Sequence, residues 1–216
     1  MSWIERIPGV LEGIPENDKA IADPFILPEF LATLSNMPTN TKQTHRFNTF
    51  KLAKGVKDAY DAAVAFTMDT EGGKLPFLTF LGLPGLGKTH LALAIGWDYL
   101  EMGRTVFYYH VAGLLNALRD GYKHSGEADY EHIAAYARNC SLLILDDLGA
   151  EKDTEWAGEQ LDMIIDTRYE NSKRLVVTTN LTLDDLPARV ADRLREGTLV
   201  HLKGESFRKT KGGTHV

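Results

Sequence analysis

Three features of this sequence predict an α/β protein whose parallel sheet carries a phosphate-binding loop. Segments typical of strands and of helices alternate from about residue 46 onward, which favours a parallel sheet with helices on both faces. The pattern G-x-x-x-x-G-K-[ST] lies between a strand and a helix, at Gly82–Thr89. A later apolar strand ends in two carboxylates, Asp146 and Asp147. We therefore expect a five-stranded parallel sheet flanked by helices, with a P-loop at its edge.

The elements of the expected core follow one another from residue 51. A helix is expected over 51–70, because its apolar positions recur near a period of 3.6 residues. The strand Leu75–Gly82 then leads through the glycine-rich loop into the helix Lys88–Met102, which Gly103 ends. The later segments continue the alternation: strands over 105–109, 141–147, 174–180 and 198–203, and helices over 112–122, 128–138, 154–170 and, in mixed form, 184–196.

The two ends of the chain differ from this core. Residues 1–45 contain five prolines, so long helices are not expected there, yet they are too apolar for a plain linker. Two interpretations stay open: an arm packed on the domain surface, or a docking segment for a partner. The tail 209–216 is basic and glycine-bearing, and we expect it to be frayed. The nucleotide-binding domain is then expected over 46–208.

The glycine-rich loop has the residues that phosphate binding requires. Gly82, Gly85 and Gly87 let the backbone curl and approach a polyphosphate, toward which the N–H groups of the loop and helix N-terminus point. We expect Lys88 to reach the β- and γ-phosphates of ATP, and the Thr89 hydroxyl to complete the Mg²⁺ shell. The other loop positions that we expect to line the site are Pro84, Leu86 and His90.

The two acids stand where a P-loop needs its acidic partner. Their apolar strand is expected in the centre of the sheet, with its carboxyl end beside the phosphates. Asp146 would hold Mg²⁺ through water, and Asp147 would orient or deprotonate the attacking water. The alternative, two surface acids at a strand end, is weakened by the P-loop upstream. Asn180 ends the next strand, where it would reach the γ-phosphate or the attacking water, or else serve turn chemistry.

Composition excludes several classes of function. The net charge of −6 argues against a protein whose main task is blanket binding of nucleic acid, although a local basic patch is compatible with it. The single cysteine, Cys140, excludes an internal disulfide and a cysteine-cluster zinc site. No apolar run approaches the roughly 20 residues that span a bilayer, so we expect no membrane partner. With no apolar signal segment at the N-terminus, the cytoplasm is the expected compartment.

Further short motifs resemble those of a known family. They are Gly82–Ala92, Leu145–Glu151, Thr154–Ala157, Ile165–Tyr169, Thr178–Leu181, Asp192–Leu194 and Gly204–Arg208. Over about residues 46–208 the chain resembles the DnaC/DnaI-type loaders of the replicative helicase, which are AAA+ ATPases. The IstB-type transposition ATPases share most of these motifs.

The resemblance implies a role for each matching residue. Lys88 and Thr89 match the Walker A pair, Asp146 the Walker B metal acid, Asn180 sensor 1, Arg193 the arginine finger and Arg208 sensor 2. A finger from a neighbouring subunit makes hydrolysis depend on assembly, because charge spreads over the γ-phosphoryl oxygens in the transition state. The alternative for Arg193 is a solvated helix charge, paired with Asp192 or Glu196.

Three departures from the family pattern affect these expectations. Asp147 stands where many AAA+ proteins have Glu, so we expect slow hydrolysis. Little chain follows Arg208, so the lid domain is expected to be absent or vestigial. Residues 1–45 are short and free of cysteine, so no zinc-bearing or long helical N-terminal domain is expected, which leaves the helicase contact open.

Loaders of this group contact single-stranded DNA with a helical insert, here about residues 111–138. Basic and aromatic residues interleave in it: Arg119, Tyr122, Lys123, His124, Tyr130, His132, Tyr136 and Arg138. Acidic residues nearly cancel their charge, so binding would be weak and salt-sensitive. The alternative is an ordinary amphipathic helix pair.

Three functions follow from these observations. The first is an ATP-dependent loader that places a hexameric replicative helicase on single-stranded DNA, and that self-associates or joins the helicase ring through Arg193. The second is an IstB-type transposition regulator that acts on duplex DNA. The third is a nucleotide-binding adaptor with negligible turnover, which Asp147 and the missing lid motivate.

Overall fold

A five-stranded parallel sheet forms the centre of the computed structural model, which describes residues 34–69, 76–121, 127–150 and 154–207. The strands are β1 (Phe77–Leu81), β2 (Val106–His110), β3 (Leu142–Leu148), β4 (Arg174–Thr179) and β5 (Thr198–His201). They lie in the order β2-β3-β4-β1-β5, and each neighbouring pair is parallel. The predicted five-stranded parallel sheet is confirmed.

The order of the strands brings three predicted site segments together. β4 lies between β1 and β3. The P-loop follows β1, Asn180 follows β4, and the two acids stand near the end of β3. Because the strands are parallel, these ends meet at one edge of the sheet, with Asn180 in the middle.

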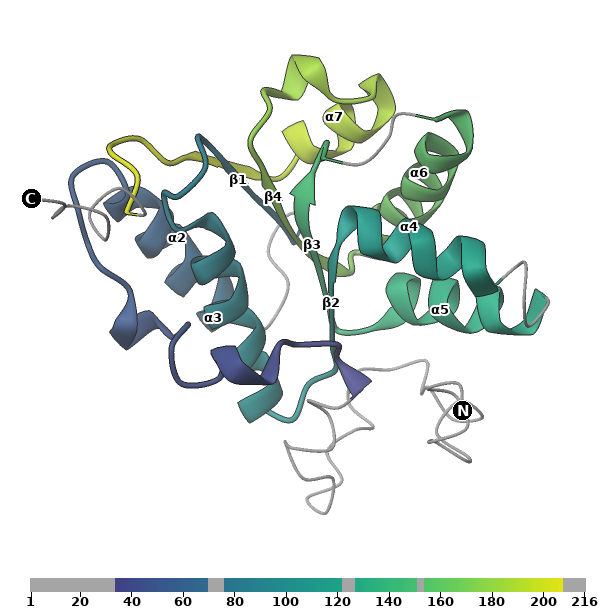
Figure 1. Cartoon of the computed structure of the whole chain (residues 1–216), viewed down its shortest axis with the longest axis horizontal. Helices are drawn as coiled ribbons and strands as arrows, with labels where there is room; N and C mark the ends of the chain where they lie inside the picture. Colours follow the sequence, from purple (N-terminus) through teal and green to yellow (C-terminus); the bar gives the residue numbers. More distant parts are fainter. Residues whose placement is uncertain (1–33, 70–75, 122–126, 151–153, 208–216) are drawn as a thin grey trace, which may run out of the picture.

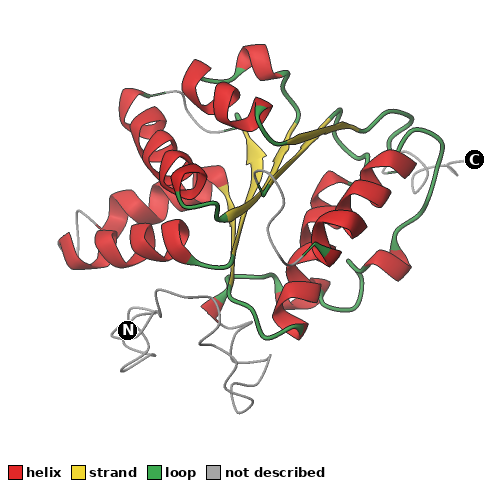
Figure 2. Ribbon diagram, turned by 180° about the vertical axis from the view of Figure 1, so that it is seen from behind, coloured by secondary structure: helices red, strands yellow, loops and turns green. Residues whose placement is uncertain are grey.

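Helices cover both faces of the sheet (Figure 1; seen from behind in Figure 2). One face carries α2 (Lys57–Met68) and α3 (Lys88–Glu101), and the other carries α4 (Val111–Asp120), α5 (Glu127–Asn139), α6 (Glu155–Glu170) and α7 (Ala188–Arg195). Alternate residues of β3 join the two cores, Ile144 on the α3 side and Leu143 on the other, which explains its unbroken apolar run. No helix in the described ranges has both the length and the apolar character to cross a bilayer.

Two expected elements differ from the structure. The helix expected from residue 51 begins at Lys57. Before it, Gly55 has a φ of 88°, and a Cβ there would collide with the Lys203 carbonyl, so the backbone crosses the segment after β5 before the helix starts. The mixed stretch 184–196 divides into a 3₁₀ turn, Leu183–Asp185, and α7, with Pro187 between them.

The described part of the predicted arm, residues 34–45, packs against β2 and α3. Tyr108 N–H donates to the Ser35 carbonyl at 2.9 Å, so this segment covers the outer edge of the edge strand β2. Trp97 Nε1 of α3 donates to Thr41 Oγ1 at 3.0 Å, and Met37 is buried. Residues 1–33 lie outside the described ranges, so a docking role for the arm stays a prediction.

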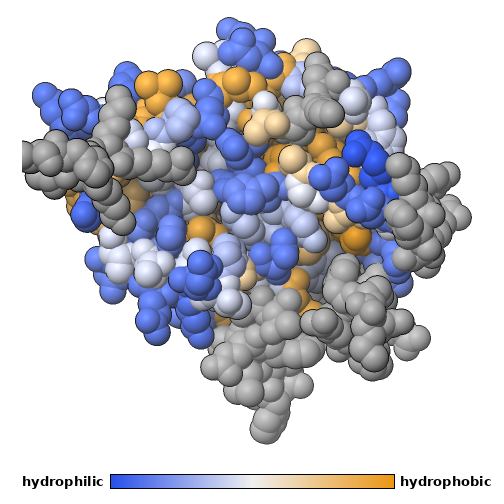
Figure 3. Space-filling view, viewed as in Figure 1, coloured by the Kyte–Doolittle hydropathy of each residue, from blue (hydrophilic) through white to orange (hydrophobic). Residues whose placement is uncertain are grey.

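Hydrophilic residues cover most of the coloured surface in Figure 3. Among the described residues, the large apolar side chains that stay exposed come from separate places in the chain: Leu52, Met68, Leu83, Met102 and Met163. Single exposed apolar residues of this kind are normal for a folded domain and carry no argument for a partner.

Arg168 of α6 connects three elements from inside the protein. Its side chain is fully buried, and its N–H groups donate to the carbonyls of Ala137, Arg138, Cys140 and Arg174 at 2.5 to 3.1 Å. The last carbonyls of a helix have no hydrogen-bond donors within the helix. Here the guanidinium donates to the last carbonyls of α5 and also to carbonyls at the starts of β3 and β4. The arginine of the Ile165–Tyr169 motif is therefore structural.

We expect Arg168→Met to destabilise the protein by about 3 kcal/mol or more, because it leaves several buried carbonyls without donors, at about 1–3 kcal/mol each. Urea unfolding measures the loss. Arg138→Met is the matched control, since Arg138 makes one partly exposed ion pair with Glu131 at 3.0 Å, and such pairs contribute less than about 1 kcal/mol. Equal losses in the two variants would contradict the role of Arg168.

Candidate nucleotide-binding site

The P-loop has a conformation that its glycines permit. Gly82, Gly85 and Gly87 have φ values of 144°, 84° and 96°, in the region that disfavours other residues. Gly87 is the residue before α3, and a Cβ there would lie 2.7 Å from the Phe50 ring. The loop therefore curls tightly over the N-terminus of α3, where the N–H groups of the helix favour an anion.

Lys88 and Asn180 join the loop to the acids. The buried Lys88 ammonium donates to the carbonyls of Gly82 at 2.5 Å and Leu83 at 3.0 Å, and to Asn180 Oδ1 at 2.7 Å. Asn180 Nδ2 in turn donates to Asp147 Oδ1 at 2.6 Å. A series of hydrogen bonds, the polar chain, thus connects Lys88 through Asn180 to Asp147, across the ends of β1, β4 and β3.

Asp146 is fully buried and receives hydrogen bonds on both carboxylate oxygens. Thr89 and Thr178 donate to Oδ1 at 2.9 and 2.6 Å, and the Tyr108 hydroxyl donates to Oδ2 at 2.8 Å. His110 Nδ1 lies 3.2 Å from Oδ2. A buried carboxylate requires such donors, since its desolvation is otherwise costly. Burial and the Asp146 charge raise the pKa of Tyr108, so its phenol stays protonated and donates.

Sequence reasoning missed three of these contacts, those of Tyr108, His110 and Thr178. All three come from strands that neighbour β3: His110 pairs directly with Asp146 in the β2–β3 register, and Thr178 belongs to β4. Their proximity depends on the strand order, which no local pattern in the sequence encodes.

Two aromatic residues at the P-loop, Phe50 through its ring and Phe207 through its backbone, were also missed. Phe50 fills the space beside Gly87, and Phe207 N–H donates to the Gly85 carbonyl at 2.9 Å. The centres of their two rings lie 6.5 Å apart in an edge-to-face arrangement. Segments before α2 and after β5 thus brace the loop from two sides.

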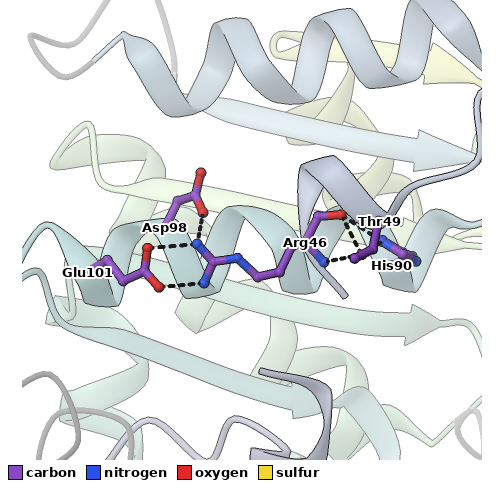
Figure 4. Close-up of polar contacts among 5 residues, drawn as sticks. All are labelled: Arg46, Thr49, His90, Asp98 and Glu101. Carbon is purple, nitrogen blue, oxygen red and sulfur yellow. Dashed lines mark hydrogen bonds and ion pairs between the residues drawn. The ribbon is translucent and has the colours of Figure 1, made fainter. Parts of the chain in front are cut away.

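Arg46 fastens the first of these segments to α3 (Figure 4). Its guanidinium donates to both carboxylate oxygens of Glu101 and to Asp98, each at 2.7 Å. The pKa values of the two acids shift in opposite directions. Burial raises the pKa of Asp98, although the charge of Arg46 lowers it in part, whereas the hydrogen bond from Arg46 lowers the pKa of Glu101. The side-chain exposures of 27% for Asp98 and 52% for Glu101 explain the difference.

The predicted arginine finger, Arg193, is held within its own chain. Its Nε donates to Asp166 Oδ1 at 2.7 Å, and its guanidinium lies 4.3 Å from the centre of the Tyr169 ring. Glu196 lies 3.7 Å away, whereas Asp192 pairs with Arg195. Arg208, predicted as sensor 2, lies outside the described residues.

The predicted DNA-contacting insert corresponds to α4 and α5, and three of its side chains contact parts of this chain outside the insert. Arg119 lies 4.8 Å from the Trp156 ring, and the Tyr130 hydroxyl donates to Gln160 at 2.5 Å. The Tyr136 ring packs edge-to-face on Phe107, whereas Arg138 pairs with Glu131 within α5. Tyr122, Lys123 and His124 lie outside the described residues. The contacts of the others favour the amphipathic helix pair.

A histidine pair beside the P-loop generates a prediction about pH. The centres of the His45 and His90 rings lie 4.8 Å apart. His90 Nε2 contacts the Arg46 carbonyl at 3.0 Å (Figure 4). Burial lowers the pKa of both from the ordinary value of 6.5, and the charge of His90 lowers that of His45 further. As the pH falls below 6.5, the unfolded chain therefore binds protons first, and the folded state loses stability.

We expect the urea midpoint to fall between about pH 7.5 and about pH 5.5. It should fall less in the double variant His45→Gln, His90→Gln, which carries no titrating pair. His132→Gln is the control. If the double variant shows the same pH dependence as the original protein, the pair contributes nothing to it.

Comparisons with known proteins agree with this fold. A family model described as IstB-like ATP binding protein matches residues 42–212. The replicative helicase loader DnaC of Escherichia coli (strain K12) is 28% identical over 160 residues, which cover 72% of this chain and 64% of that protein.

Solved structures share the fold. The crystal structure of the DnaC helicase loader superposes with a TM-score of 0.65 at 26% identity, over 75% of this chain and 98% of that one. AMPPCP-bound DnaA from Aquifex aeolicus superposes with a TM-score of 0.68 at 21% identity, over 78% of this chain and 55% of that one, and shows the fold alone. The chain has the AAA+ P-loop fold and belongs to the family of IstB-like ATP binding proteins.

Proposed function

We propose that this chain binds ATP and Mg²⁺ at its P-loop and uses them to load a replicative DNA helicase onto single-stranded DNA. The observation that carries the nucleotide part is the polar chain Lys88–Asn180–Asp147 beside the buried Asp146. The loader part is supported by the similarity to DnaC, which matches this chain in sequence and in fold. The chain spans only 64% of the length of that relative, so its partners are part of the proposal.

The residues present fit ATP and Mg²⁺. The curled loop and the start of α3 offer N–H groups to phosphates, and Lys88 already lies inside the loop. Thr89 Oγ1 and Asp146 Oδ1 lie 2.9 Å apart and supply the hard oxygen ligands that Mg²⁺ prefers, directly or through water. On binding, Lys88 would exchange its loop carbonyls for phosphate oxygens, which attract its charge more strongly.

Two features support an ATPase that is slow in the isolated chain. Asp147 would orient the attacking water, and its carboxylate is held by Asn180. Arg193 would serve a neighbouring subunit only after leaving Asp166 and Tyr169. Assembly, on itself or on the helicase ring, would then supply the missing positive charge at the γ-phosphate.

A second function, transposition regulation on duplex DNA, is favoured by the IstB-like family model that matches residues 42–212. DNA preference separates the two. A loader binds single strands, weakly here because side chains of α4 and α5 already contact α6 and β2 and their charges nearly cancel, whereas the regulator binds duplex.

The loader proposal is tested by co-elution of the chain with the replicative helicase of its own host on a sizing column, with and without ATP. We expect a shared peak. Lys88→Ala, which removes the ammonium from the loop, shows whether the shared peak depends on bound nucleotide. Separate peaks under all conditions would contradict the loader function, and binding to duplex DNA would then favour the transposition regulator.

Replacement of the proposed finger tests the role of assembly. We expect the Arg193→Ala variant to bind ATP as the original chain does, because Arg193 is proposed to act only on a neighbour's nucleotide. Its rate of hydrolysis should fall by about 10³-fold or more. Phosphate release and ATP affinity are measured on the assembled protein. Arg195→Ala is the control, since Arg195 lies on the same helix and pairs with Asp184 and Asp192. Full turnover in Arg193→Ala would identify Arg193 as a surface charge.

A further inference from the structure

The pairing of β3 with β4 is irregular where the two acids stand. The register shifts between Leu145 and Leu148. Within the shift, Asp146 and Asp147 stand against a single residue of β4, Thr178. Two residues opposite one form a β-bulge, which redirects side chains near functional sites. In a regular strand the two acids would point to opposite faces of the sheet.

The bulge places Asp147 in an unfavourable backbone conformation. Its φ is 60°, in the left-handed region that residues other than glycine seldom adopt, with Asp and Asn among the more frequent exceptions. A conformation of this kind persists where surrounding contacts hold it. The backbone contact made across the sheet is a hydrogen bond from Asp147 N–H to Thr178 Oγ1 at 2.9 Å.

The Thr178 hydroxyl makes a second hydrogen bond, which fixes the direction in which the hydroxyl donates its proton. It donates to Asp146 Oδ1 at 2.6 Å while it accepts from Asp147 N–H. A hydroxyl has one donor and two acceptor positions, so the two bonds are compatible and leave no second proton to donate. Thr178 is itself buried, which keeps water from replacing either bond.

We propose that Thr178 is a positioning residue for ATP hydrolysis, because its hydroxyl fixes the carboxylate of Asp147 relative to that of Asp146. With the bulge held, Asp147 Oδ1 meets Asn180 Nδ2 at 2.6 Å, and Asn180 meets Lys88. The orientation of the acid at the attacking water is thus set from the neighbouring strand. This inference rests on the proposed ATPase function.

The test compares Thr178→Val, which keeps the shape and removes the hydroxyl, with Thr178→Ser, which keeps the hydroxyl. Thr67→Val is the matched control, because Thr67 is also buried and its hydroxyl donates within α2, to the Ala63 carbonyl at 2.9 Å. Three quantities are measured on the full chain: exchange of the Asp147 amide proton without nucleotide, ATP affinity with and without Mg²⁺, and kcat with KM in the assembled protein.

We expect Thr178→Val to lose protection of the Asp147 amide and to lower kcat at least about tenfold. Its KM and its ATP affinity without Mg²⁺ should stay within about threefold, since the P-loop is untouched. Thr178→Ser should stay within about threefold of the original chain in every measurement.

Other outcomes overturn the inference in distinguishable ways. Normal kcat in Thr178→Val shows that the hydroxyl is not needed, and a serine variant as slow as the valine variant shows that the methyl group matters instead. An equal loss in Thr67→Val shows general destabilisation. If the original chain binds no ATP, the proposed function fails and the positioning role fails with it. If the original chain binds and hydrolyses ATP and Thr178→Val does so equally well, only the positioning role is refuted.

Discussion

A fully buried carboxylate, that of Asp146, is the charge around which the rest of the site is arranged. Its hydrogen-bond donors come from three separate elements: Thr89 from α3, Tyr108 from β2 and Thr178 from β4. Leaving such a group without donors costs more than any single bond contributes, so these elements must be in place together. The charge that would hold Mg²⁺ in function is therefore also a constraint on the fold.

Much of the architecture could be predicted from the sequence, because its signals are local. The P-loop pattern, the apolar runs of the strands and the helical periodicity each depend on neighbours along the chain, and all five strands lie where expected to within a few residues. The strand order β2-β3-β4-β1-β5 was not predicted, and it brings the ends of β1, β4 and β3 to one edge of the sheet. Lys88, Asn180 and Asp147 meet for this reason, although each was identified from its own segment.

Features that depend on distant parts of the chain could not be predicted. The bulge at Asp147 needs Thr178 across the sheet, and the late start of α2 at Lys57 needs the backbone of Lys203. The pairing of Arg193 with Glu196 was among the expected alternatives, but its contacts with Asp166 and Tyr169 and those of the α4–α5 pair were missed for the same reason. Composition shows that charged and aromatic side chains are present but not which neighbours they contact. Tertiary context decided each of these cases.

The position of β1 in the sheet has a consequence for how the protein is made. β1 pairs only with β4 and β5, which follow much later in the chain. During synthesis the P-loop therefore leaves the ribosome well before the strands that support it, and pairings so distant in sequence form slowly. The apolar β1 must wait unpaired, exposed to aggregation or to chaperones, until most of the domain exists. The ability to bind nucleotide is thus a late event in folding, and ATP stabilises only the completed domain.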